Sequence, residues 1–220
     1  MRKKTNHIKL KNIWDIENSF YLKSDVTRLK KAISHYEVFK KTINVKGSVV
    51  ECGVFKGISL IRFLTYRDIL FHKIKKYVYG FDIFGKFPSQ LSVKDNLFAK
   101  SHDRKAGYGK PVKDLNRALK AKKFINYKLI KGEVSKTIPL FLKKNKNFKI
   151  SFLHIDLDVY EPTSFVLNAF YKHVSVDGII LLDDYLSIDG ATRAINTFVK
   201  KNKLKLKTLK DNKKIRYIVK

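Results

Sequence analysis

Two short acidic clusters stand directly after apolar stretches of the kind that form buried strands. The first lies in His154-Ile155-Asp156-Leu157-Asp158, and the second is Asp183-Asp184, which follows the apolar residues 178–182. Carboxylates that share one crevice repel each other unless protons or a cation intervene. A ligand set made only of oxygen suits Mg²⁺ or Mn²⁺ better than zinc. The clusters therefore indicate a site for a hard divalent cation, and an acidic patch with helix caps is the alternative.

The positions of these acids along their strands favour convergence. Asp156 and Asp158 have the same parity, so both would point to one side if the strand continued through them. His154 shares that parity but lies deeper, which favours a place in the core or beside the ligands over a place among them. Because parallel neighbours lie about 4.8 Å apart, acids at the ends of strands 149–158 and 178–185 could meet at one point.

A glycine turn near the start of the chain has the pattern of a ligand-binding loop. Residues 49–59 read VVECGVFKGIS, in which an apolar run meets Glu51 and then Gly53 and Gly57. Glycine tolerates positive φ and lets a ligand approach the bare backbone. Free N–H groups at the helix start, near Ser59, would face an anionic group. A plain strand-to-helix turn is the alternative reading.

A second strand, residues 76–82, ends in another acid, Asp82. In dinucleotide and adenosyl binders, an acid at this place commonly accepts hydrogen bonds from ribose hydroxyls. An aspartate that only initiates a turn is the competing interpretation.

The elements that must position these residues alternate between strands and helices. We expect strands at 48–50, 76–82, 126–133, 149–158 and 178–185, then a hairpin of 205–209 and 215–219; helices are expected at 25–43, 58–71, 112–122, 137–144, 163–173 and after Gly190. The first helix would bury a face of Val26, Leu29, Ile33, Tyr36, Phe39 and Ile43. This order predicts an α/β fold whose Rossmann-like sheet has seven strands, five parallel ones and a C-terminal hairpin, with helices on both faces.

The chain is organised as one domain with an extension and a long connection. Residues 1–45 form a basic segment and helix that belong to the same domain, with Ile13, Trp14 and Tyr21 as packing anchors. Residues 46–220 form the main body. Residues 83–111 show no clear period and contain several glycines and prolines, so we expect a lid over the site.

Composition limits the class of protein. The 220 residues include 44% hydrophobic side chains and one cysteine, Cys52, which is compatible with a reducing cytoplasm. No apolar run reaches the length of a membrane span. The net charge of +29, from 48 Lys+Arg and 19 Asp+Glu, would attract polyanions. Because the lysines are spread over the whole chain, we expect nonspecific attraction rather than a specific nucleic-acid partner.

The motifs together resemble one family. ECGVFKGIS, FDIFGKFP, KLIKGE, HIDLDVYEPT, and GIILLDDY with GATRA occur in the order and spacing of the macrocin-type O-methyltransferases, whose members methylate sugar hydroxyls of antibiotics. The likeness runs from about Ser34 to the C-terminus. It implies a class I methyltransferase domain, S-adenosylmethionine as cofactor and a Mg²⁺ (or Mn²⁺) site at the methyl acceptor.

The resemblance also assigns roles to residues. The implied cofactor contacts are Glu51, Gly53, Gly57 and Ser59 at the methionine end, Asp82 at the ribose, and Gly132 and Glu133 at the adenine. The implied metal ligands are Asp156, Asp183 and Asp184. Asp156 is also the candidate general base, with Asp158 as the runner-up.

The expected function is therefore transfer of a methyl group to a sugar hydroxyl of a nucleotide-linked sugar, a glycan or a glycosylated metabolite. The acceptor could be anionic, and a homo-oligomer is compatible with the sequence. One alternative is an oxidoreductase with a nicotinamide cofactor, although the turn lacks the G-x-G-x-x-G fingerprint. The other is a basic RNA-binding methyltransferase, for which only the charge argues.

Overall fold

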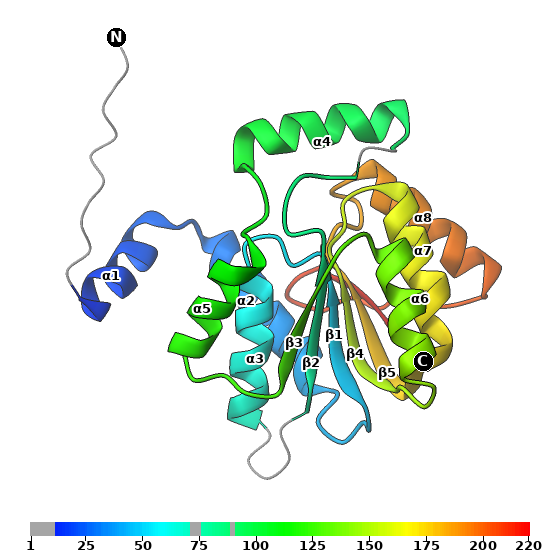
Figure 1. Cartoon of the computed structure of the whole chain (residues 1–220), viewed down its shortest axis with the longest axis horizontal. Helices are drawn as coiled ribbons and strands as arrows, with labels where there is room; N and C mark the ends of the chain where they lie inside the picture. The colour runs from blue at the N-terminus through cyan, green and yellow to red at the C-terminus, as the bar shows by residue number, and fades with distance from the viewer. Residues whose placement is uncertain (1–11, 71–75, 89–90) are drawn as a thin grey trace.

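A mostly parallel sheet forms the centre of the molecule, as seen in a computed structural model that describes residues 12–70, 76–88 and 91–220 (Figure 1). Its strands are β1 (Ser48–Cys52), β2 (Val78–Asp82), β3 (Tyr127–Lys131), β4 (Ile150–Ile155), β5 (Val174–Leu182) and β6 (Arg216–Val219). They lie in the order β3-β2-β1-β4-β5-β6, and β6 runs antiparallel to its neighbour β5. The predicted α/β architecture with five parallel strands is confirmed.

The C-terminal hairpin is the part of the sheet that differs from the prediction. Within the described residues the sheet has six strands instead of seven, because residues 205–209 make only an isolated bridge between Lys207 and Tyr217. Leu206 and Leu209 nevertheless pack against the two cores.

Helices cover both faces of the sheet (Figure 1). The helices are α1 (Ile13–Lys23), α2 (Val26–Lys40), α3 (Ile58–Leu70), α4 (Val93–Ala106), α5 (Val112–Ala121), α6 (Val134–Lys144), α7 (Tyr160–Phe170) and α8 (Asp189–Lys201), with a 3₁₀ turn, η1, at Tyr171–His173. One core cluster joins α2, α3 and α5 to one face, and a second joins α6, α7 and α8 to the other.

Strand periodicity explains these two cores. Val49 belongs to the α2–α3 core, whereas its neighbour Val50 belongs to the α7–α8 core; Phe152 and Leu153 divide in the same way. Successive side chains of a strand point to opposite faces, so a strand that is apolar at every position is buried on both. Each fully buried large side chain contributes about 1.5–3 kcal/mol.

The N-terminal part of the chain packs differently from the prediction. In α2 the buried residues are Ser34, His35, Val38 and Phe39, whereas Val26 and Ile33 are 78% and 54% exposed. Of the predicted apolar face Phe39 is buried, but His35 also faces the core. Ile13, Trp14 and Tyr21 on α1 are also exposed and do not act as anchors. The basic residues 1–11 lie outside the described part of the chain.

The connection expected to be a lid contains a helix. Residues 93–106 form α4, which lies across the edge of the sheet where the parallel strands end (Figure 1). Its N-cap is Ser92, whose Oγ accepts a hydrogen bond from the Asp95 amide at 3.1 Å. The helix was not predicted because few of its side chains are buried, so its sequence, VKDNLFAKSHDRKA, shows no clear apolar period.

Candidate active site

A cavity of about 1200 Å³ opens at the carboxyl ends of the parallel strands. It is lined by residues from the glycine loop, from the ends of β2 and β4, from the start of α6, and from α1, α2 and α4. In open α/β sheets, ligands bind in the crevice outside the carboxyl ends of the strands. Pockets for one small molecule usually measure about 300–1,000 Å³, so this cavity lies above that range.

The glycine loop follows β1 as predicted, but its glycines are required by the protein's own packing. Gly53 has φ +91, and a Cβ there would lie 1.7 Å from the carbonyl oxygen of Asp156. Gly57 has φ +86, and a Cβ there would lie 2.5 Å from a methyl group of Leu115 on α5. Gly53 and Ser59 line the cavity, whereas Gly57 is buried behind it.

The carboxylate of Asp82 fixes this loop. Its Oδ2 accepts hydrogen bonds from the backbone amides of Val54 and Phe55, at 2.7 and 2.8 Å, and its Oδ1 accepts one from Phe84. A carboxylate has about four acceptor sites, so one remains for a ligand in the cavity that Asp82 lines. Asp82 thus serves the turn, and the ribose contact stays a prediction. Gly132 and Glu133, beyond β3, line the same cavity.

Glu51 lies below the cavity and is not among the residues that line it. Its side chain is fully buried, and Oε1 lies 3.0 Å from Nδ1 of His154, while Oε2 has no hydrogen-bond partner among the residues that the structure describes. Its position does not support the predicted contact with the methionine end of a cofactor. It supports instead a role in holding His154.

Three carboxylates meet on the other side of the glycine loop. Asp156, Asp158 and Asp184 each offer an oxygen, and these atoms all lie within 4.8 Å of one another. The strands bring them together because the Asp183 amide donates to the carbonyl of Ile155 at 3.1 Å. The predicted convergence of acids from β4 and β5 is therefore present, although β4 ends at Ile155 and a turn, not a continued strand, orients Asp156 and Asp158.

The backbone of this turn is itself unusual. Asp158 has φ 65, the left-handed region in which aspartate is tolerated better than most residues. Its amide donates to Oδ2 of Asp184 at 3.1 Å, and its carbonyl accepts from Ala191 at the start of α8. These bonds hold the β4 turn against the segment after β5.

Burial and mutual repulsion act on the three acids. Burial, followed by the charges of Asp183 and Asp184, raises the pKa of Asp156 well above its usual range. Burial and the charges of Asp158 and Asp183 do the same to the pKa of Asp184. Burial raises the pKa of Asp158 to about 6. The three groups are stable as carboxylates together only beside a cation.

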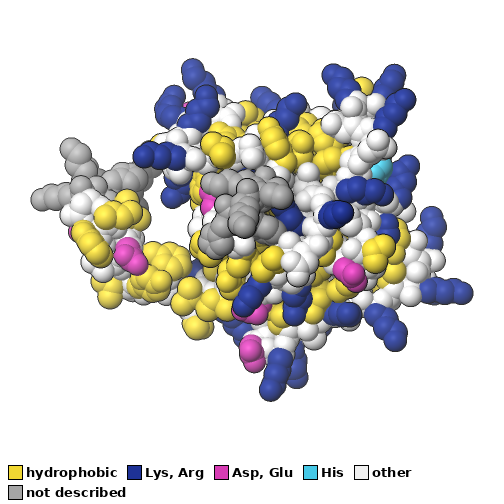
Figure 2. All heavy atoms as spheres, turned by 90° about the horizontal axis from the view of Figure 1, so that it is seen from below, with side chains coloured by type: hydrophobic (Ala, Val, Ile, Leu, Met, Phe, Trp, Pro, Cys, Tyr) yellow, Lys and Arg dark blue, Asp and Glu magenta, His cyan; other side chains and the backbone are white. Residues whose placement is uncertain are grey.

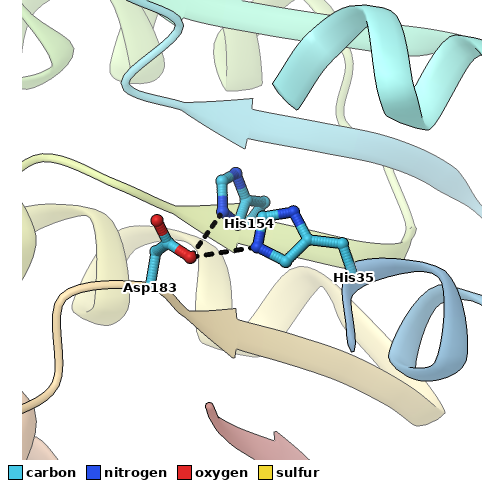
Figure 3. A group of neighbouring side chains, drawn as sticks. All are labelled: His35, His154 and Asp183. Carbon is cyan, nitrogen blue, oxygen red and sulfur yellow. Dashed lines mark hydrogen bonds and ion pairs between the residues drawn. The ribbon is translucent and has the colours of Figure 1, made fainter. Parts of the chain in front are cut away.

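Asp183 belongs to a separate group (Figure 3). Its Oδ1 lies 3.0 Å from Nε2 of His35 on α2 and 3.9 Å from Nε2 of His154 on β4. Its Oδ2 forms an ion pair with Lys31, one turn before His35 on the same helix. Burial opposes ionisation of Asp183, but the charge of His154, 3.9 Å away, and the hydrogen bond with His35 hold its pKa well below the usual range.

The two histidines of this group differ in charge. Burial lowers the pKa of His35 to about 4, so it is neutral and donates from Nε2. Burial also disfavours the charged form of His154, but the carboxylate of Asp183, 3.9 Å away, and the hydrogen bond with Glu51 outweigh it and raise its pKa to about 9. The Glu51 contact, at 3.0 Å, is the close one. His154 is thus the fully buried neighbour of the acids that its depth in β4 predicted, and it does not line the cavity.

The family of the chain is shown by its sequence. The model of the Macrocin-O-methyltransferase (TylF) family matches residues 23–214. The chain belongs to the macrocin O-methyltransferase family. It is an O-methyltransferase, and the family predicted from its motifs is confirmed.

Solved structures agree with this macrocin O-methyltransferase fold. CalS11, a calicheamicin methyltransferase, has a TM-score of 0.77 at 22% identity and covers 94% of this chain and 85% of its own. The O-methyltransferase NovP has a TM-score of 0.71 at 22% identity, and the match covers 87% of this chain and 79% of NovP. At this identity the likeness concerns the fold. No curated protein matches the sequence closely enough to count as a relative.

Several residues of this macrocin O-methyltransferase site were missed from the sequence. Lys31 and His35 reach Asp183 from α2, which was expected to present an aliphatic face. His102 on α4 lines the cavity close enough to Asp158 to affect its pKa. The spacing of Lys31 and His35, four residues apart on one helix, is the signal that places both on one face.

Proposed function

We propose that this macrocin O-methyltransferase transfers a methyl group from S-adenosylmethionine to a sugar hydroxyl, with Mg²⁺ or Mn²⁺ at the acidic cluster. The observation that carries the proposal is the cavity itself, which is lined by the glycine loop and by Asp156 and Asp158, with the buried Asp184 within 4.8 Å of both carboxylates. CalS11 is described as a TDP-rhamnose 3'-O-methyltransferase, which supports a sugar as the acceptor.

The residues of the cavity fit the donor on the side of β1, β2 and β3. In this arrangement Gly53 and Ser59 would border the methionine end of the donor. Asp82 would lie beside its ribose, and Gly132 and Glu133 would lie beside its adenine. S-adenosylmethionine would supply an electrophilic methyl group on a sulfonium. The protein's part is to hold the acceptor oxygen in line with that methyl, because orientation at about 3 Å supplies much of the rate.

The acidic cluster fits a hard cation by its donor atoms. Asp156 and Asp184 belong both to the predicted ligand set and to the group that the geometry brings together. The third ligand is Asp183 according to the sequence prediction and Asp158 according to the distances. A divalent cation would lower the pKa of a bound hydroxyl and orient it.

One of these carboxylates must accept the proton of the acceptor hydroxyl. The sequence prediction assigned this role to Asp156, with Asp158 as runner-up. Asp156 and Asp158 both line the cavity, and a carboxylate that binds the cation has its lone pairs engaged, so the role falls to Asp158 if Asp183 completes the ligand set as the sequence predicts. Its pKa of about 6 also suits a general base near neutral pH.

Substitutions in these acids separate the roles. Asp156→Asn should abolish turnover, lower Mn²⁺ affinity and leave S-adenosylmethionine binding within about twofold, as measured by calorimetry. If Asp158 is the base, Asp158→Asn should keep Mn²⁺ affinity while kcat falls by about 10²–10⁴. If it is the third ligand, Mn²⁺ affinity falls in that variant and not in Asp183→Asn.

The function as a whole has a direct test. Folded protein should bind S-adenosylmethionine and transfer its labelled methyl group to a sugar in a panel of acceptors, and EDTA should suppress the transfer until Mg²⁺ is restored. A null titration of the folded protein with S-adenosylmethionine would reject the proposal. Methyl transfer that continues unchanged in EDTA would reject the metal site but not the methyltransferase activity.

We also propose α4 as the lid. Leu91, His102 and Ala106, at or near this helix, line the cavity that it crosses. A helix that closes over both substrates would exclude water during transfer.

A further inference from the structure

Two arginines line the cavity without a partner. Arg28 on α2 and Arg62 on α3 both border it. Within residues 12–70, 76–88 and 91–220, neither guanidinium takes part in an ion pair, a side-chain hydrogen bond or a cation–π contact. Asp25 is near enough for Arg28 to lower its pKa, but its carboxylate caps α2 by accepting from the Thr27 amide.

The other cations of the cavity have contacts of their own. Lys31 pairs with Asp183, and Lys136 lies 2.9 Å from Glu133. Lys56 donates to the carbonyl of Ala106, and Lys86 lies 5.1 Å from the ring centroid of Tyr108. Among the described residues that line the cavity, Arg28 and Arg62 therefore differ from these lysines in making no such contact.

The two arginines are close to each other through the contact of their helices. The hydroxyl of Tyr66 on α3 donates to the carbonyl of Ala32 on α2 at 2.8 Å. Arg62 lies four residues before Tyr66, and Arg28 lies four residues before Ala32. Residues four apart stack on one helix face, so each arginine lies one turn from this shared contact.

The pair also lies close to the acids. Lys31 follows Arg28 by three residues on the same face of α2 and reaches Asp183, beside the acidic cluster. The helix that carries Arg28 is thus tied through Lys31 to the segment that holds the acids. An arginine fork matches phosphate oxygens bidentately, and its charge is never lost by deprotonation.

We propose that Arg28 and Arg62 bind a phosphate or diphosphate group of the acceptor, so that the enzyme methylates a sugar esterified to phosphate and not a neutral glycoside. This inference rests on the proposed function and names its substrate class. It gives part of the +29 charge a specific use.

Calorimetry in EDTA at 150 mM salt tests the site without turnover, with inorganic pyrophosphate as the probe. Wild-type protein should bind it, and Arg28→Gln/Arg62→Gln should lose at least tenfold in affinity. Arg117→Gln is the matched control, because Arg117 is 73% exposed on α5 and outside the cavity lining; its affinity should stay within twofold. Equal losses in both variants, or no binding by the wild type, would overturn the proposal.

A panel of UDP-glucose, glucose 1-phosphate and methyl glucoside then separates the sources of the phosphate. Tighter binding of either phosphorylated sugar than of methyl glucoside, lost in the double variant, supports the site and shows whether one phosphate or two are held. Binding of all three sugars that is unchanged in the double variant overturns it. Arg28→Gln alone, at an exposed position, repeats the test where folding is not at risk.

The competing ligand for these arginines is the carboxylate of the methyl donor. S-adenosylmethionine affinity should stay within twofold in the double variant. A loss of tenfold or more there would assign the arginines to the donor and overturn the inference while the proposed function stands. If the wild type binds no S-adenosylmethionine, it is the proposed function that fails.

Discussion

Asp183 shows how a buried carboxylate is kept ionised in this site. His35 donates to it, Lys31 pairs with it, and His154 lies between it and Glu51 (Figure 3). A buried charge is costly unless it is paired and hydrogen-bonded. Asp183, its three partners and Glu51 therefore form a network whose stability depends on its protonation.

His154 gives this network a measurable dependence on pH. Its folded pKa of about 9 lies above the ordinary 6.5, so its stabilisation is complete below pH 6.5 and is lost as pH rises through 9. We expect the free energy of unfolding to fall by about 1–3 kcal/mol between pH 6.5 and 9.5. Urea denaturation of metal-free protein at several pH values measures this change.

The matched variant for that measurement is His154→Gln, which keeps a side-chain donor and cannot titrate. Its stability should be lower at pH 6.5 and nearly flat up to pH 9.5. A wild-type curve as flat as that of the variant would contradict the assigned charge of His154.

At the scale of elements, α4 is a helix at the cavity that buries few of its residues. Among its residues only Asp95 and Ala99 are buried. Asp95 Oδ2 accepts from the amide of Tyr160, the first residue of α7, at 3.1 Å, and Lys94 pairs with Asp189 on α8. The helix is thus held at its N-terminal end by polar bonds more than by apolar packing.

Asp95→Ala should loosen this attachment. Loss of a buried hydrogen bond to a charged acceptor costs about 1.5–3 kcal/mol, and a looser lid should raise KM for both substrates by about three- to tenfold. Hydrogen exchange of residues 93–106 would show faster opening.

Asp95→Asn is the control, because its amide oxygen can still accept from Tyr160. It should keep most of the exchange protection. Equal protection in the alanine variant and the wild type would show that Asp95 does not hold α4.

The sequence predicted the elements whose signal is local. Strands such as 150–155 and the glycine turn were found because apolar runs and glycines mark them directly. The helix 93–106 was missed because it buries little, and the strand expected at 205–209 lacks a complete partner. The link of His35 and Lys31 to Asp183 joins residues about 150 positions apart, which spacing along one chain does not encode.

At the scale of the whole molecule, the positive charge is widely distributed. Figure 2 shows lysine and arginine side chains scattered over one face, while apolar side chains gather over α1. None of the described helices is long and apolar enough to cross a membrane. A scattered charge attracts polyanions without selecting among them.

We therefore expect weak, sequence-independent RNA binding that disappears with salt. The affinity for a 20-nucleotide single strand should fall at least tenfold between 50 and 200 mM NaCl, because counterion release dominates such binding. Fluorescence anisotropy with two unrelated sequences measures it. Selective binding that survives 200 mM salt would revive the RNA-methyltransferase alternative.

Gly53→Ala is expected to damage both halves of the site at once. The added methyl would collide with the carbonyl of Asp156, and φ +91 is strained for alanine. Affinities for S-adenosylmethionine and for Mn²⁺ should fall together, whereas Ser59→Ala should affect only the former. Calorimetric titrations of the two variants compare them.

The absence of a Cβ at Gly53 also limits which parts of the site can change in sequence. The loop after β1 and the turn that carries the acids are in direct contact at Gly53, where a Cβ would lie 1.7 Å from the carbonyl oxygen of Asp156. A change in one would displace the other, so we expect differences in acceptor preference to arise from the helices that border the same cavity, α1 to α4 and α7.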